Sequence, residues 1–282
     1  MRKTTTTPAD LLAARYGRDP GFTPPEWNPT LAVQLGHRSA RRWLDQDVDA
    51  DTIRTLAAAA QSASTSSNRQ LVSVVAVRDP EKKWALGEVG GPAQFPHIST
   101  APVILVWLID TSRTRHAVQR HQQEASEVDY AGLRYIDEAF IGAVDIGIAA
   151  QNAVVAAESL GLGAVFLGSM RNDAARVAEI VGAPEHVVPF LGLALGHPDP
   201  AEPAGTKPRI PQEAFLHWEA YDAEAAVDVA AYEQTLASYF SRYGKPSLWR
   251  RQQALRVSAK HVESGRRHLL RRVFEKAGFG LR

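Results

Sequence analysis

Residues 139–170 have the sequence AFIGAVDIGIAAQNAVVAAESLGLGAVFLGSM and form the most apolar stretch of the chain. Its apolar character is interrupted by Asp145, Gln151, Asn152 and Glu158. These intervals are shorter than the roughly 20 apolar residues that a membrane span requires. The pattern predicts a helix over 135–160 that ends at Gly161, followed by a strand over 164–167. Because this helix has almost no polar face, we expect it to be buried, either in the core or against a partner subunit.

The rest of the chain shows further strand and helix patterns around that region. Short apolar runs predict strands over 71–77, 101–109 and 190–195. A helix is expected over 53–60, with Asp49 or Asp51 as its N-cap, and a second one over 174–181. The polar stretch 111–127 is compatible with a helix or with a mobile segment.

Three parts of the chain differ in composition. Residues 1–30 are rich in Thr, Pro and Gly, which predicts an N-terminal extended arm. Residues 31–222 carry the strand patterns and are expected to form the folded core. Residues 223–282 predict a basic C-terminal extension of two or three helices, separated at Gly244–Pro246.

The overall composition is that of a folded globular protein. Of the 282 residues, 45% are hydrophobic and 22% are charged. Cysteine is absent, which excludes disulfides, thiolate metal sites and cysteine nucleophiles. The formal net charge is +1, yet residues 241–282 contain twelve Lys and Arg against only Glu263 and Glu275. Residues 1–10 lack the apolar stretch of a secretory signal, so a cytoplasmic location is expected.

Three polar clusters are candidates for ligand binding. His37–Arg42 places Ser39 between arginines at an expected helix start, where a hydroxyl, free backbone N–H groups and guanidinium groups together suit a phosphate. Ser64–Asn68 offers four hydroxyls and an amide, which suit hydrogen bonding to a ribityl chain or a sugar. Lys207–Arg209 holds two cations beside a rigid proline link. Each cluster taken alone also fits an ordinary helix cap or solvated turn.

Motif spacing argues against several other kinds of site. Gly161, Gly163 and Gly168 follow a helix rather than a strand, so they do not form a dinucleotide-binding fingerprint. The first two of these glycines are better interpreted as a helix stop. The chain has no Gly-x-Ser-x-Gly elbow, and the spacing of His116 and His121 matches no zinc site. We therefore expect no metal site and name no catalytic residue.

Several short sequence motifs follow one another in a specific order along the chain. They are His37–Arg41, Ser64–Ser67 with Gln70, Ala149–Gly163, Leu167–Asn172, Gly192–Pro198 and Lys207–Arg209. This ordered set resembles the nitroreductase family of FMN-dependent oxidoreductases. The resemblance is closest to the branch of NADPH-dependent, oxygen-insensitive nitroreductases and NADPH:flavin reductases. It covers residues 31–221 well and the C-terminal extension loosely.

The resemblance implies a fold and an assembly. The fold is an α+β nitroreductase-like sandwich with a central, mostly antiparallel sheet flanked by helices. The assembly is an intertwined homodimer that binds FMN at the subunit interface, so residues 31–222 would be the FMN-binding core.

The resemblance also assigns the cofactor contacts position by position. The phosphate and ribityl contacts of FMN would come from His37, Arg38, Ser39, Arg41, Lys207 and Arg209. The loop near the ribityl chain and the ring would be Thr65, Ser66 and Ser67. An amide that binds the pyrimidine edge of the ring would be Gln94, before which Pro92 and Ala93 look inserted. The segment whose backbone approaches the ring and its N5 would be Phe166, Leu167, Gly168 and Ser169. The contacts to the NADPH 2′-phosphate would be Arg242 and Lys245.

The activity that the resemblance implies is the reduction of nitroaromatics, quinones or flavins with NADPH as the preferred donor. The cofactor would carry the chemistry, with ping-pong hydride transfer through the flavin N5 and no obligatory protein acid or base. The expected partners are a small aromatic electron acceptor and a second copy of the chain, with no nucleic acid and no membrane. The stretch 113–135 would line the acceptor side.

Two alternatives remain at this point. The same fold and cofactor could serve another redox reaction, such as dehalogenation or ring desaturation. A non-enzymatic protein could instead use the basic C-terminal extension to bind a partner. However, the arginine pairs of this extension alternate with Val257, Leu269, Leu270 and Phe274, which is more typical of a packed amphipathic helix.

Overall fold

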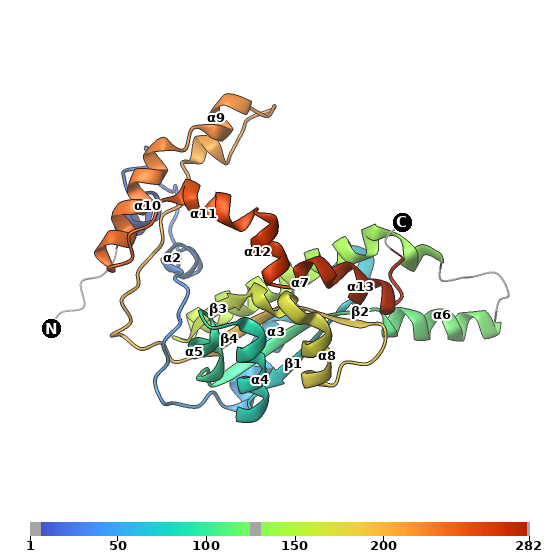
Figure 1. Ribbon diagram of the computed structural model, residues 1–282. Helices are drawn as coiled ribbons and strands as arrows, with labels where there is room; N and C mark the ends of the chain where they lie inside the picture. The colour runs from blue at the N-terminus through green and yellow to red at the C-terminus, as the bar shows by residue number, and fades with distance from the viewer. Residues whose placement is uncertain (1–6, 125–130, 281–282) are drawn as a thin grey trace. The chain divides into compact units, whose positions relative to one another are not determined.

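The computed structural model describes residues 7–124 and 131–280. The chain divides into two compact units, whose elements are labelled in Figure 1. Unit 1 comprises Met1–Arg38 and Pro203–His261, and unit 2 comprises Ser39–Glu202 and Val262–Arg282. Each unit is therefore assembled from two separate parts of the sequence, a division that differs from the boundaries expected at residues 30 and 222.

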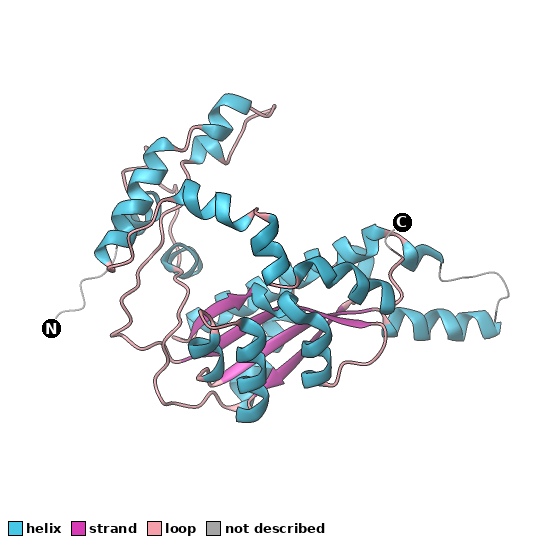
Figure 2. Cartoon of the chain, in the orientation of Figure 1, coloured by secondary structure: helices cyan, strands magenta, loops and turns pink. Residues whose placement is uncertain are grey.

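Unit 2 is built on a four-stranded sheet, drawn in magenta in Figure 2. Its strands are β1 (Val72–Val77), β2 (Val103–Asp110), β3 (Gly163–Leu167) and β4 (Val187–Gly196). The strand order is β1-β2-β4-β3, and every neighbouring pair is antiparallel. The four predicted strands are all present, and the prediction of a mostly antiparallel sheet flanked by helices is confirmed.

Helices cover both faces of this sheet (Figure 1). One face packs against α3 (Ala50–Gln61), α7 (Ile136–Ser159) and α13 (Leu270–Lys276). The other face packs against α4 (Pro80–Gly90), α5 (Phe95–Ser99) and α8 (Ala174–Val181). This unit also contains α6 (Ser112–Glu124), so the expected 111–127 stretch is helical over residues 112–124, and its residues 125–127 lie outside the described residues.

Strand β2 is apolar from Val103 to Ile109 because this part lies in the middle of the sandwich. Val103, Leu105, Trp107 and Ile109 pack on the face covered by α3, α7 and α13. The residues between them, Ile104, Val106 and Leu108, pack on the face covered by α4, α5 and α8. Alternate side chains of a strand point to opposite faces, so a strand covered on both faces needs apolar residues at every position. Strand β4 keeps the same arrangement with one irregularity. Trp107 pairs with Leu191 and Leu108 with Pro189, which leaves Phe190 as a bulged residue.

Helix α7 is buried on one side only. Helices α7 and α3 pack together against the sheet, and Asp49 caps α3 as expected. Gly142 of α7 lies so close to β2 that a Cβ there would be 2.5 Å from Ile109. By length and composition α7 could cross a membrane, but its buried apolar residues belong to the core over the sheet. Its opposite side exposes a stripe of large apolar residues at helical spacing: Ile136, Phe140, Val144 and Ile148. This side of α7 is therefore not part of the core of the single chain, and its expected burial against a partner subunit stays a prediction.

Unit 1 is helical. Its helices are α1 (Pro8–Tyr16), α2 (Pro29–Gly36), α9 (Ala223–Val227), α10 (Ala230–Arg242) and α11 (Trp249–Arg256), and α12 (Ala259–Ser264) follows. The expected extended arm is thus partly helical. The reason is local: Thr7 and Asp10 form a reciprocal capping box around Pro8, which occupies the first helical position.

Short 3₁₀ turns connect several of these elements. They are Ser66–Asn68, Ala131–Arg134, Gly168–Asp173, Gln212–Ala214 and Arg267–Leu269. The C-terminal extension forms more helices than the two or three expected. Non-helical residues at Asp228, Val257 and Gly265 divide it further.

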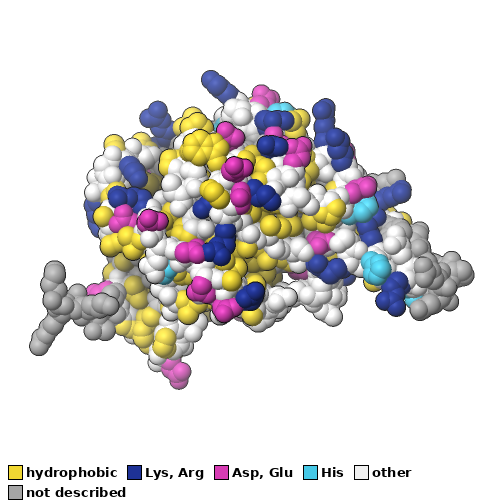
Figure 3. Space-filling view, turned by 90° about the horizontal axis from the view of Figure 1, so that it is seen from below, with side chains coloured by type: hydrophobic (Ala, Val, Ile, Leu, Met, Phe, Trp, Pro, Cys, Tyr) yellow, Lys and Arg dark blue, Asp and Glu magenta, His cyan; other side chains and the backbone are white. Residues whose placement is uncertain are grey.

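The cations of the extension are partly paired with carboxylates. Arg250 bonds Glu233 at 2.8 Å, and Arg271 bonds Glu275 at 2.8 Å. Mixed charges are not confined to the extension: on the face of the molecule seen from below in Figure 3, Asp and Glu side chains also lie among Lys and Arg side chains. This pairing and the burial of Phe274 agree with the interpretation of the extension as a packed amphipathic segment.

Candidate cofactor site

The segment His37–Arg42 does not begin a helix, contrary to the sequence-based expectation. Helix α2 ends at Gly36, and the following residues are non-helical. Ser39 forms an isolated parallel bridge with Ala164 of β3, and the Ala40 N–H donates to the Ala164 carbonyl at 3.0 Å. Strand β3 is an edge strand, so its outer backbone groups are available to pair with this segment. The expected helix dipole is therefore absent from this cluster.

The backbone N–H of Arg41 is also not free. It donates to the two carboxylate oxygens of Glu202, at 3.1 and 3.2 Å. The Arg41 charge acts on a neighbour as well: burial first, and this charge second, lower the pKa of His97 below its ordinary value. Gly163 has a role besides ending α7, because a Cβ there would lie 2.6 Å from the Cβ of Ala40. A glycine at this position lets the segment that carries Ser39 pack directly on β3.

Two predicted phosphate-binding residues of unit 1, His37 and Lys207, are joined by Arg15, which the sequence analysis did not single out. Arg15 lies in α1 and is buried, with 7% of its surface exposed. Its guanidinium donates to the carbonyls of Leu35 at 2.7 Å, His37 at 2.9 Å and Lys207 at 3.1 Å. These acceptors are 20 to 192 residues away in the sequence. Arg15 therefore fixes the backbone of the His37 segment beside that of the Lys207 segment.

The backbone around Lys207 is held at a second point. The Arg209 N–H donates to the Arg15 carbonyl at 2.7 Å, so α1 both accepts from this segment and donates to it. The Lys207 ammonium lies 5.6 Å from the ring centroid of Phe240. The first helix thus organises Lys207 and Arg209, although its sequence belongs to the part expected to be an arm.

The Ser64–Asn68 loop is anchored to α7 by two buried acids. Ser66 donates to the Asp145 carboxylate from its backbone N–H at 3.0 Å and from its hydroxyl at 2.8 Å. Arg69 forms a two-pronged ion pair with Glu138, at 3.0 and 2.7 Å. Asp145 is 1% exposed and lies two helical turns from Glu138 on the same side of α7. The sequence analysis treated Asp145 only as an interruption of an apolar run.

This loop carries backbone strain. Ser67, Asn68 and Gln70 all have positive φ, at 49°, 54° and 53°. Non-glycine residues rarely adopt this region, and such strain persists only where the surrounding structure enforces it. The bonds to Asp145 and Glu138 supply that enforcement, and they leave Thr65 half-buried and Ser67 exposed.

Two residues predicted to approach the flavin ring are hydrogen bonded to each other. The Ser169 hydroxyl donates to the side-chain carbonyl of Gln94 at 3.0 Å. The two residues are 75 apart in the sequence, and Ser169 is 1% exposed. Gln94 precedes α5, so the inserted Pro92 and Ala93 do not keep it from the Gly168–Asp173 turn.

The neighbouring residues of this segment differ in exposure. Leu167 is buried, whereas Phe166 is 36% exposed on β3. The Gly168 carbonyl accepts a hydrogen bond from Arg267 at 3.3 Å, and the same guanidinium donates to the Asn172 side chain at 2.9 Å. Residues from the C-terminal extension therefore hold the turn that follows β3.

The two residues predicted to bind the NADPH phosphate lie at the end of α10. Gly244, with φ of 65°, closes the helix with the two hydrogen bonds of a Schellman motif, Gly244 to Ser241 and Lys245 to Phe240. Arg242 lines a polar cavity of about 420 Å³ in unit 1 together with hydroxyl-bearing residues, Thr235, Ser238, Tyr239 and Tyr243. Within the described residues, the side chains of Arg242 and Lys245 form no ion pair.

Comparisons with known proteins relate this geometry to a family. The family model described as "Nitroreductase family" matches residues 35–94 and 91–197, and "Nitroreductase family, C-terminal domain" matches residues 207–282. The chain belongs to the nitroreductase family. The recognition made from the ordered motifs is thereby confirmed.

Individual members of the nitroreductase family agree with this assignment. The "NADPH-flavin oxidoreductase" of Vibrio harveyi is 36% identical over 246 residues, which cover 86% of this chain and 95% of the relative. The "FMN reductase (NADPH)" of Bacillus subtilis is 35% identical over 216 residues, which cover 76% of this chain and 84% of the relative. The solved structure of B. megaterium NfrA2 superposes with a TM-score of 0.81 at 31% identity, covering 91% of this chain and all of that one.

These nitroreductase-family relatives bear on the class of enzyme. Their names agree with the predicted class, an NADPH-dependent flavin oxidoreductase, and with the predicted cofactors, FMN and NADPH. The structural similarity confirms the nitroreductase-like fold.

Proposed function

We propose that this protein is an FMN-dependent NADPH oxidoreductase that reduces flat aromatic acceptors, namely nitroaromatics, quinones or free flavins, and that it acts in the cytoplasm. The observation that carries the proposal is the hydrogen bond between Ser169 and Gln94. It joins a buried serine and a half-buried glutamine, two residues that the family resemblance assigns to the flavin ring.

The available donors fit FMN. The side-chain carbonyl of Gln94 accepts from Ser169, so the amide N–H groups of Gln94 are left to donate. Within the described residues these N–H groups form no hydrogen bond. An amide donor suits the carbonyl oxygens at the pyrimidine edge of a flavin. The cations of the His37–Arg41 and Lys207–Arg209 segments suit a phosphate that carries close to two negative charges.

Each group of residues has a role in binding or orientation. When bound, FMN supplies reversible hydride transfer, the chemistry that flavins perform. Ser169 orients Gln94, and Asp145 orients the strained loop at Ser66. Arg15 holds the backbone that presents Lys207. No side chain needs to act as an acid or a base, so we name no catalytic residue.

We infer the preference for NADPH from Arg242 and Lys245. An unpaired guanidinium in a cavity lined by hydroxyls, with a lysine three residues further on, suits the 2′-phosphate that distinguishes NADPH from NADH. Arg242→Gln should lower the NADPH to NADH ratio of kcat/KM by about tenfold, the value of one charge-assisted phosphate contact. Arg256→Gln, on the next helix, is the matched control. An unchanged ratio in Arg242→Gln would remove this assignment.

We also propose that the protein is a homodimer. The exposed stripe on α7 supports this proposal, since Phe140 and Val144 are 59% and 54% exposed in the single chain. Stripes of large apolar side chains are typical of subunit contacts. Phe140→Asp should shift the mass measured by light scattering from dimer towards monomer, whereas a wild-type mass of one chain would contradict the proposal.

Steady-state kinetics test the activity. NADPH oxidation by the FMN-loaded protein should depend on added nitroaromatic, quinone or free flavin. Double-reciprocal plots at several acceptor concentrations should be parallel, as in a ping-pong scheme. No acceptor-dependent oxidation with any of the three classes would refute the proposed activity.

A further inference from the structure

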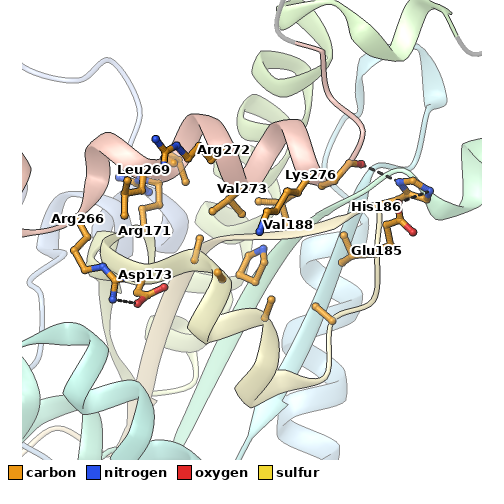
Figure 4. A pocket seen from close by; sticks show the side chains of 18 of the residues that line it. Arg171, Asp173, Glu185, His186, Val188, Arg266, Leu269, Arg272, Val273 and Lys276 are labelled. Atoms are coloured by element: carbon orange, nitrogen blue, oxygen red, sulfur yellow. Dashed lines mark hydrogen bonds and ion pairs between the residues drawn. The ribbon is translucent and has the colours of Figure 1, made fainter.

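Unit 2 contains a cavity that has no part in the proposed flavin chemistry. It has a volume of about 410 Å³ and lies between α8, the start of β4 and α13 (Figure 4). This volume falls within the roughly 300 to 1,000 Å³ that is common for small-molecule sites.

The walls of the cavity are mainly apolar. Helix α8 contributes small side chains, Ala174 and Ala178, and α13 faces them with Leu270 and Val273. Because alanines stand where larger residues would close the gap, the two helices do not fill the space between them. Val188 of β4 lies at the base, beside the Lys276 side chain that reaches from α13 (Figure 4). An occupant therefore needs an apolar body.

The charges around this apolar space are mostly positive. Four cationic side chains and two carboxylates line it: Arg171, Arg266, Arg272 and Lys276, with Asp173 and Glu185. Asp173 is already paired with Arg266 at 2.5 Å, and Glu185 is 74% exposed. Arg272 and Lys276 form no ion pair within the described residues, so their charges remain available.

Arg171 is the most buried of these cations. Its guanidinium donates to the backbone carbonyl of the bulged Phe190 at 2.9 Å, and it lies 4.8 Å from the centroid of the Phe190 ring. Among the residues that the structure describes, no carboxylate pairs with Arg171. Burial first, and the charge of Arg267 second, lower the pKa of Arg171. A bound anion would relieve both of these costs.

We propose that this cavity binds a small organic carboxylate with an aromatic or medium-chain aliphatic body. The apolar walls take the body, and Arg171, Arg272 and Lys276 bind the carboxylate. A neutral ligand would leave these cations unused. A nucleotide or another polyanion would have to place polar groups against alanine, valine and leucine side chains.

Calorimetry with three ligands that share one apolar body tests the anion preference. The FMN-loaded protein is titrated with phenylbutyrate, phenylbutanol and phenylbutylamine. Phenylbutyrate should bind about tenfold more tightly than the alcohol, the value of one charge-assisted contact, and the amine should bind least. Equal affinity for the three ligands, or no binding of phenylbutyrate, would refute the proposal.

Variants locate the binding to this cavity. Ala178→Phe fills the space and should abolish phenylbutyrate binding. Arg272→Gln and Lys276→Gln should each weaken binding by about fivefold, as expected for exposed cations. Arg271→Gln is the matched control, since Arg271 lies on the same helix but pairs with Glu275 outside the cavity. An affinity for phenylbutyrate that neither Ala178→Phe nor Lys276→Gln changes, or that falls equally in Arg271→Gln, would place the ligand elsewhere and overturn the proposal.

Discussion

Replacement of Arg15 by methionine should weaken FMN binding although Arg15 lies in the first helix and is not expected to contact the cofactor. The buried guanidinium donates to three carbonyls, including those of His37 and Lys207. Methionine keeps the aliphatic bulk and removes all three donors. The two segments expected to bind the phosphate would then lose their common support.

The magnitude follows from these three bonds. A hydrogen bond from a charged donor contributes about 1.5 to 3 kcal/mol where water is excluded. The acceptor residues Leu35, His37 and Lys207 are only half-buried, so water can replace part of each lost hydrogen bond. We therefore assign about 1 kcal/mol to each bond. The total of about 3 kcal/mol corresponds to roughly a 100-fold ceiling on the increase in Kd. Since part of the loss destabilises unit 1 itself, we expect the Kd for FMN to rise by at least about tenfold.

Titration of the apoprotein with FMN, followed by flavin fluorescence, measures this effect. Arg18→Met provides the control, because Arg18 is on the same part of the chain, is 59% exposed and approaches Glu213 only at 3.9 Å. A surface ion pair of this kind contributes about 0 to 1 kcal/mol, so its Kd should be nearly unchanged. If Arg15→Met binds FMN within twofold of both wild type and Arg18→Met, Arg15 does not organise the phosphate-binding segments.

Three further changes have defined outcomes. Ser169→Ala removes the donor to Gln94 and should raise the Kd for FMN about fivefold at a cost of roughly 1 kcal/mol; an unchanged Kd would contradict the role of Gln94. Glu138→Gln breaks the partly buried ion pair with Arg69 and should lower the free energy of unfolding in urea by about 2 kcal/mol, whereas no loss would show that the pair does not hold the strained loop. Burial lowers the pKa of His97 below 6.5, so the unfolded chain binds a proton before the folded one does as the pH falls. The melting temperature should therefore fall as the pH decreases from neutral through 6.5, and His97→Gln should show a flatter profile.

The sheet and its helices could be predicted because local patterns determine them. The continuous apolar run at 101–109 and the cap at Asp49 both reflect the physical environment of the residues that carry them. Helix α7 was only half-predictable. Its apolar sides are alike in sequence, and only packing on the sheet determines that Ile146 is buried while Val144 is exposed.

The errors have tertiary causes. Ser39 has the sequence context of a helix cap, but the open edge of β3 at Ala164 pairs with it instead. Arg15 carried no recognisable signal, because its acceptors are backbone carbonyls up to 192 residues away. Asp145 could have been suspected, since a carboxylate in an apolar helix is costly unless it is hydrogen bonded. Its partner Ser66 could not have been identified without the fold.

The absorbance spectrum of the purified protein, recorded before and after anaerobic addition of NADPH, tests the central claim most directly. The proposed function predicts flavin bands in the near-ultraviolet and visible range that bleach when NADPH is added. A colourless protein that cannot be reconstituted with FMN, or flavin bands that NADPH leaves unchanged, would contradict it.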